Sequence, residues 1–361
     1  MGTLGCVDRR SSLQTSKRVE GRCSLVLRRV NFVVSVFAPR SSSTLIHSSL
    51  GFGSSSIPLY NGASLARNQD IVVVTINYRT NVFGFPASPD LRLEKNNLGH
   101  LDQEQALLWV TKNARRFGGD EARVTIMGQS AGAESVSAAL ARHPPFQPYS
   151  AAVLLSGAIP DLSPLTKPPS DPALAYENFN SFATAMGCTG PPGEERLGCL
   201  RAVPAEKIKE YVNGNETGPF GFPLVDNATY FPRPLSRVHA NITSRVPMLI
   251  GALEDDGSLF TITETNITTF LRSSLLISGE LVANWQEDEE DMVRSLYPGL
   301  NDTEVISKVY RDVVFACPSS LWADGYAESF NIKNVYRYMY GAQFADFQPF
   351  PGAGVWHTSE R

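Results

Sequence analysis

One serine of this chain stands where it could act as a nucleophile. Ser130 is the centre of the only G-x-S-x-G pentapeptide, at residues 128–132. About 0.2 copies would arise by chance at this glycine and serine content, so its context decides its meaning. A β-branched run at 123–127 precedes the pentapeptide and a helix-forming run at 133–140 follows it. Such an elbow lifts the serine hydroxyl to a helix N-terminus, which favours a developing negative charge. The simpler interpretation is that Ser130 only caps the helix.

A serine nucleophile needs a base, which in this architecture follows the serine and the acid along the chain. Three histidines follow Ser130, namely His143, His239 and His357. His143 lies at the end of the predicted nucleophile helix, roughly 20 Å from the elbow. His239 lies in a loop-like stretch with no strand before it. His357 lies in a glycine-rich loop after a predicted strand at 334–341, which favours it as the base.

The acid that orients the base should follow a strand end between the serine and the histidine. A predicted strand at 246–251 is followed by Glu254, Asp255 and Asp256. Three consecutive acids can also form a solvated turn. We expect one of them to be the acid, and the spacing does not choose among them.

The elements that must position these residues alternate along the chain. β-Branched runs predict strands at 30–38, 71–78, 123–128, 151–156, 246–251 and 334–341. Helices are predicted at 101–117, 131–142, 172–186, 301–315 and 319–330. This alternation favours an α/β fold with a mostly parallel central sheet and helices on both faces. Residues 1–29 carry seven Arg and Lys with few large apolar groups and are predicted to be disordered.

The composition excludes several classes of function. The chain has 361 residues, 42% of them hydrophobic, and a net charge of −4. These values are typical of a globular protein and give no reason to expect a nucleic-acid partner. No run of 18 apolar residues predicts a membrane span, no signal peptide is visible, and no His, Cys and carboxylate cluster has metal-ligand spacing. We therefore expect no metal and no cofactor, and the sequence indicates no particular oligomeric state.

With these residues the chain resembles the type B carboxylesterases, the cholinesterase and fungal-lipase branch of the α/β-hydrolases. The resemblance implies an α/β-hydrolase domain over 30–361, shortened at both ends, with 1–29 outside it. It selects Asp256 as the acid and makes Gln129 and Ser156 supporting residues beside the catalytic ones. It also implies a serine hydrolase that cleaves small-molecule or lipid carboxylic esters through an acyl-enzyme. The segments that carry the resemblance are 71–79, 83–85, 97–110, 117–120, 124–132, 156–157, 256–260 and 354–357.

The sequence departs from that family at its site. Gln129 and Asp256 stand where the family commonly has glutamate. The family's H-G-G-G-F stretch, which supplies half of the oxyanion hole, corresponds here to 46–53, where Ser48, Ser49 and Leu50 replace glycines. The Ala131 N–H remains as one donor and Gly51 is the candidate for the second. Losing one donor costs about 2.7–4 kcal/mol, or 100- to 1,000-fold in rate. We therefore expect an impaired esterase, and the alternatives are a non-catalytic homologue of the same fold or an unstable fragment.

Two features point to the secretory route. Cys188 and Cys199 flank a turn-rich loop and resemble a family disulfide, against the alternative of two reduced thiols. Sequons and a disulfide together favour an oxidising compartment, so we expect a secreted protein by family resemblance although no signal peptide is visible. About three sequons would arise by chance. The five that occur are at Asn215, Asn227, Asn241, Asn266 and Asn301.

Overall fold

The fold is known from a computed structural model. It describes residues 30–37, 50, 54–55, 60–142, 147–159, 172–214, 220–274, 287–330 and 334–360. The segment 1–29, for which disorder is predicted, lies outside these residues. So do Gly51, Ser48, Ser49 and Asn215.

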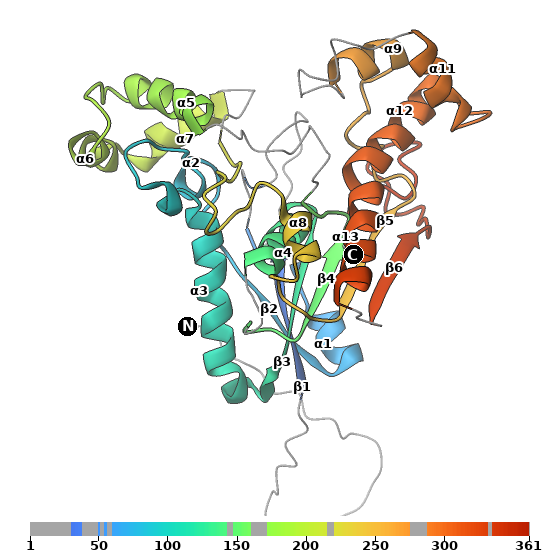
Figure 1. Ribbon diagram of the computed structural model, residues 1–361, viewed down its shortest axis with the longest axis horizontal. Coiled ribbons are helices and arrows are strands. Elements are labelled where there is room, and N and C mark those ends of the chain that lie inside the picture. The colour runs from blue at the N-terminus through green and yellow to red at the C-terminus, as the bar shows by residue number, and fades with distance from the viewer. Residues whose placement is uncertain are drawn as a thin grey trace, which may run out of the picture.

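A parallel sheet is the centre of the molecule (Figure 1). Its strand order is β2-β1-β3-β4-β5-β6, and every neighbouring pair is parallel. The order reverses direction at β1, which lies between β2 and β3. In open parallel sheets this switch point opens a crevice at the carboxyl ends of the strands, where ligands bind. The strands are β1 (Val30–Phe37), β2 (Ile71–Thr75), β3 (Gly119–Gln129), β4 (Ala151–Leu155), β5 (Met248–Leu253) and β6 (Val335–Tyr340).

All six predicted strands occur, and their ends differ for local reasons. β2 ends at Thr75 instead of residue 78, and two of the residues that follow bond outside the sheet. The Asn77 side chain accepts the N–H of Ser55, and the Arg79 N–H donates to Asp102. β5 begins two residues later than predicted, after Pro247. Proline has no N–H to donate to a neighbouring strand.

Helices cover the two faces of the sheet unequally. The main core lies on one face, where alternate residues of β3, β4 and β5 meet α3, α4, α8 and α13. On the opposite face, Gly62, the N-cap of α1, lies against Val73. The neighbours of Val73 in β2, Val72 and Val74, pack into the main core. The bounds are α1 (Ala63–Gln69), α3 (Leu98–Asn113), α4 (Ala131–Arg142), α8 (Pro234–His239) and α13 (Cys317–Phe330).

The predicted helices are present with modified ends. The segment predicted at 101–117 is α3 followed by a 3₁₀ turn, η3 (Ala114–Phe117). The segment at 301–315 is α12 (Asp302–Arg311), which widens into the π-helical η5 (Asp312–Ala316). Asn301 caps α12 in a capping box with Glu304. The remaining elements are α2 (Asn81–Gly84), η2 (Leu93–Lys95), α5 (Pro172–Ala185), α6 (Glu194–Ala202), α7 (Ala205–Gly214), α9 (Ile267–Thr269), η4 (Phe270–Ser274) and α11 (Glu287–Ser295).

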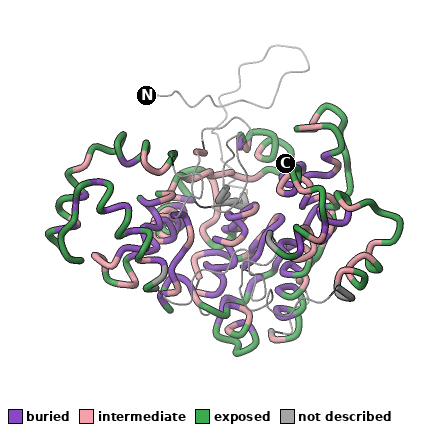
Figure 2. The backbone as a smooth tube through the Cα atoms, turned by 90° about the horizontal axis from the view of Figure 1, so that it is seen from above, coloured by how far each residue is buried: buried purple, intermediate pink, exposed green. Residues whose placement is uncertain are grey.

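Two groups of helices stand above the sheet with small cores of their own (Figure 1). The group α5–α7 encloses Phe179, Phe182, Met186 and Leu200, and Val82 of α2 packs against them. The group α9 to α12 has a separate apolar cluster. Figure 2 shows that buried backbone is concentrated in the middle of the molecule, while the outer turns of both groups are exposed.

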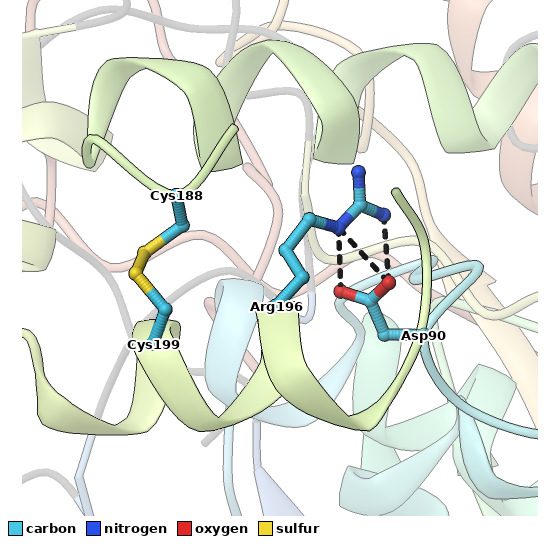
Figure 3. Close-up of a disulfide and its surroundings, with 4 residues drawn as sticks. All are labelled: Asp90, Cys188, Arg196 and Cys199. Carbon is cyan, nitrogen blue, oxygen red and sulfur yellow. Dashed lines mark hydrogen bonds and ion pairs between the residues drawn. A yellow bond between two sulfur atoms is a disulfide. The ribbon is translucent and has the colours of Figure 1, made fainter. Parts of the chain in front are cut away.

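The α5–α7 group, which we call the cap, is fastened by a disulfide and an ion pair (Figure 3). The disulfide joins Cys188 to Cys199 of α6, as the sequence predicts. One turn away, Arg196 forms an ion pair with Asp90, whose side chain is completely buried. Asp90 also accepts the N–H of Gly193 at 2.8 Å. A buried carboxylate is stable only with such partners.

We expect Arg196→Met to destabilise the protein by about 3–5 kcal/mol, because it leaves Asp90 as a buried charge without its cation. The matched control is Arg201→Met on the same helix. Arg201 pairs with Glu194 in an exposed position, with side chains 62% and 80% exposed, and its loss should cost no more than about 1 kcal/mol. Denaturant unfolding of both variants with the disulfide intact measures the difference, and equal costs would contradict the assignment.

Candidate active site

The Ser130 backbone is a strained turn between β3 and α4. Its φ is 56°, in the left-handed region that disfavours a side chain. The turn is held because the Ser130 N–H donates to the carbonyl of Leu155, and its own carbonyl accepts the N–H of Glu134. A Cβ at Gly128 would lie 2.1 Å from the backbone of Gly132. The small residues around Ser130 are therefore required for the strand and helix to meet within one residue.

The neighbouring strand repeats this tight geometry. Ser156, the residue after β4, is completely buried with a φ of 47°. A Cβ at Gly157 would lie 2.6 Å from the Ser130 carbonyl. The Ser156 hydroxyl lies 3.5 Å from a carboxylate oxygen of Glu360. The structure thus places Ser156 beside the elbow, where it contacts the segment that follows His357.

Asp256 and His357 meet although 101 residues separate them. The Asp256 Oδ1 lies 2.7 Å from the His357 Nδ1, and both side chains are buried. The Leu253 N–H donates to the other carboxylate oxygen at 2.9 Å, so the acid is held from two sides. The rings of Phe260 and Phe315 lie against the imidazole, with centroids 4.9 and 4.7 Å away. This packing leaves the imidazole little freedom to rotate.

The three consecutive acids have different partners. Glu254 is exposed. Asp255 binds the His357 loop, because its Oδ2 accepts the Val355 N–H at 2.8 Å and its own N–H donates to the Val355 carbonyl. Lys308 of α12 holds the other Asp255 oxygen at 2.7 Å. Asp255 therefore positions the loop, a role that sequence spacing does not reveal.

Gln129 contacts the opposite nitrogen of His357. Its side-chain Nε2 lies 3.1 Å from the His357 Nε2, and Gln129 is completely buried. Because Ser130 follows Gln129 directly, this contact brings the imidazole to the turn that carries the hydroxyl. The residues far apart in sequence thus converge at the carboxyl end of β3.

Ala131, the predicted oxyanion donor, is buried at the N-terminus of α4. Its methyl group packs in a small cluster with Leu50, Phe85 and Tyr78. The Leu50 carbonyl accepts the Asn81 N–H at 3.0 Å, and its side chain is 2% exposed. Leu50 is therefore a core residue beside Ala131. Gly51, the candidate second donor, lies outside the described residues.

A titratable group that the sequence analysis did not single out lies in the first turn of α4. Burial raises the pKa of Glu134 to about 7. Burial, and secondarily the charge of Glu134, also raises the pKa of Tyr78 and of Tyr310. Tyr310 stacks on Phe260, which contacts His357. The only sequence feature that could have indicated the role of Glu134 is its place among small residues directly after the elbow.

The remaining predicted sites lie at the surface. The side chains of Asn227, Asn241, Asn266 and Asn301 are exposed, and the last two accept N–H bonds as helix N-caps. In the described part of the chain, no three His, Cys, Asp or Glu residues are grouped so that they could hold a metal ion. Across those same segments, no helix combines the length and apolar character needed to cross a bilayer.

Comparisons with known proteins show the family of the chain. The sequence model of the carboxylesterase family matches residues 33–361. A chlorogenic acid esterase from Aspergillus niger is 36% identical over 188 residues, which are 52% of this chain and 35% of that protein. Secreted lipase 5 from Gibberella zeae is 30% identical over 322 residues, 81% of this chain and 51% of that protein. The chain thus spans about half or less of the length of these curated relatives.

Solved structures share the fold. The crystal structure of the Geobacillus stearothermophilus carboxylesterase EST55 is 27% identical, with a TM-score of 0.69. The match covers 88% of this chain and 63% of that one. The central sheet and its helices are therefore those of an α/β-hydrolase, as the sequence predicts.

We expect Glu134→Gln to change how stability depends on pH. The carboxyl titrates near 4.5 in the unfolded chain and near 7 in the folded protein. Between these values the folded protein holds a proton that the unfolded chain has released, so the parent loses stability as pH rises. The variant has no such loss. Its free energy of unfolding should exceed that of the parent by about 3 kcal/mol above pH 7 and should equal it below pH 4.5.

Denaturant unfolding at several pH values measures this effect. The same change at Glu177, exposed on α5, controls for the general loss of a negative charge. A difference between Glu134→Gln and the parent that does not grow from pH 4.5 to 7 would show that burial does not control this carboxyl.

Proposed function

We propose that this chain, which belongs to the carboxylesterase family, is a serine hydrolase that cleaves carboxylic esters through an acyl-enzyme. The observation that carries the proposal is the buried Asp256–His357 contact, which lies at the turn bearing Ser130. An aspartate on Nδ1 orients an imidazole so that Nε2 can accept a proton from a serine hydroxyl.

The residues then have distinct tasks. The Ser130 oxygen attacks the ester carbonyl while the His357 Nε2 takes the hydroxyl proton. Asp256 holds the Nδ1–H and stabilises the imidazolium that forms. The Ala131 N–H, at the start of α4, donates to the oxyanion. His357 gives the proton to the departing alcohol, and a water molecule then releases the acid from Ser130 by the same steps in reverse order.

The oxyanion hole is the weak part of this machinery. Gly51 is the candidate for the second N–H donor, and we infer that Ser48 and Ser49 would hinder its approach to the substrate. Glycines serve at such places because backbone donors must come close to the substrate oxygen. With one secure donor the rate should be lower by about 100- to 1,000-fold.

The relatives support a proposal for the substrate class and the location. One relative is named an esterase of chlorogenic acid and another a secreted lipase, so we propose a small-molecule or lipid ester as substrate. The disulfide between Cys188 and Cys199 supports an oxidising, extracellular location. The exposed asparagines of the sequons would then carry glycans.

The first test is covalent labelling. A fluorophosphonate should modify the folded parent at Ser130, because the base activates that hydroxyl, and Ser130→Ala should lose the label. Ser64→Ala, exposed on α1, is the matched control and should keep it. Peptide mapping locates the modification. A folded parent that takes up no label would favour the non-catalytic homologue, and a label that persists in Ser130→Ala would refute the nucleophile.

The second test concerns the oxyanion hole. We expect the double variant S48G/S49G to raise kcat for a short-chain aryl ester by about 10-fold or more with little change in KM, because the second donor acts in the transition state. Adding Leu50→Gly should lower stability by about 2–5 kcal/mol, since that side chain packs beside Ala131. Steady-state kinetics and thermal unfolding measure both effects. A parent as fast as ordinary esterases, and unimproved by the glycines, would contradict the impairment.

A further inference from the structure

Both ring nitrogens of His357 have a protein partner. Asp256 lies on Nδ1 at 2.7 Å, and the Gln129 amide lies on Nε2 at 3.1 Å. All three side chains are buried, so water does not screen these bonds. The Nε2 contact is notable because that atom is the one that must receive the Ser130 proton.

The chemistry of this contact depends on the protonation state of the imidazole. The Gln129 Nε2 is a donor only, so it can bond to the His357 Nε2 only when that atom has a lone pair. This requires the neutral tautomer with hydrogen on Nδ1, which then donates to Asp256. Once Nε2 is protonated, two N–H groups would face each other.

A glutamine can bond to both the neutral and the protonated imidazole, whereas a glutamate cannot. Rotation about the last side-chain bond exchanges the amide N–H for the carbonyl oxygen, which would accept from a protonated Nε2. A carboxylate in its place could only accept, and would stabilise the charged imidazole alone. A methionine of similar length could do neither.

The backbone of Gln129 prevents it from moving away. It is the last residue of β3 and pairs with Leu155 of β4 and Phe37 of β1. The strained turn at Ser130 follows at once. Because the strand is held on both sides, the backbone of Gln129 stays beside His357 through the reaction.

We propose that Gln129 is a positioning residue for His357. In the resting enzyme its amide N–H bonds to the Nε2 lone pair and favours the tautomer that can act as a base. This bond gives way when the Ser130 hydroxyl donates to Nε2, and after proton transfer the rotated amide accepts from the imidazolium. The inference deepens the proposed function and rests on it for the role of His357. The contact between the two side chains, however, can be tested without catalysis.

Other titratable groups also face this histidine. Asp256 follows β5, Glu360 belongs to the same loop as His357, and the charges of both carboxylates act on Tyr338 of β6. Tyr310 of α12 and Glu134 of α4 lie beyond the ring of Phe260. All five are unchanged by substitution at position 129. Because Glu134 titrates near 7, the comparison is repeated in a Glu134→Gln background.

The experiment compares Gln129→Glu with Gln103→Glu. Gln103 is a buried glutamine of α3 that donates to Ser135, so the control adds the same charge without touching His357. Two properties are measured against pH: the rate constant of fluorophosphonate labelling, and the ring-nitrogen resonances of His357 in ¹⁵N-histidine protein. The chain has five histidines, and a His357→Ala spectrum identifies the resonance. The spectra are also recorded in Ser130→Ala, which does not turn over.

We expect Gln129→Glu to move the His357 titration midpoint and the acid limb of labelling upward by about one pH unit or more. Gln103→Glu should match the parent. An unmoved midpoint in folded Gln129→Glu, or an equal shift in Gln103→Glu, would overturn the inference. If Gln129→Glu does not fold, Gln129→Met decides, because the proposal requires its neutral Nε2 resonance to differ from that of the parent.

The two proposals can fail separately. A midpoint that Gln129→Glu shifts, together with a parent that takes no label, would refute the serine hydrolase and keep the Gln129 contact. Normal labelling at Ser130 with an unmoved midpoint would refute the Gln129 role and keep the hydrolase.

Discussion

The close approach of strand and helix around Ser130 is the constraint on which the rest of the site depends. β3 ends and α4 begins within one residue, and this is possible only because Gly128 leaves room for the backbone of Gly132. The left-handed Ser130 is held from the next strand by Leu155. Strain of this kind persists only when its surroundings determine it completely. The parallel sheet supplies that support.

The acid and the base reach this turn from distant parts of the chain, and their loops are held by different means. Asp256 is anchored to β5 by the Leu253 N–H. His357 depends on Asp255, which bonds to the backbone of Val355 while Lys308 holds its other oxygen. A charge on α12 thus contributes to the position of the imidazole, although it does not touch it. Adjacent acids of one turn thus have different partners, since Asp256 bonds to the His357 ring and Asp255 to the backbone of the loop that carries it.

Much of this architecture could be predicted, because the strands are β-branched or apolar runs in the sequence and the elbow has a compact signature. The ends of β2 and β5 could not, since they depend on contacts outside the sheet and on Pro247. The same holds for the role of Asp255 and for the atom of His357 that Gln129 contacts. Gln129 and His357 are 228 positions apart, and only the folded chain shows which atoms they present to one another. The oxyanion loop departs from the family pattern in sequence, while the packing of Leu50 on Ala131 is visible only in three dimensions.

The cap and the central sheet are stabilised by largely separate contacts. Its apolar cluster is distinct from the main core, so the energy that keeps α5–α7 ordered is largely local. The cross-link at Cys188 and the ion pair of Arg196 with Asp90 close this unit on itself and pin it to the segment before α3. Cooperative units with their own contacts open below the threshold for global unfolding. Amide hydrogens of the cap should therefore exchange by a subglobal opening while those of the sheet remain protected. A reducing environment should increase this difference in exchange rate.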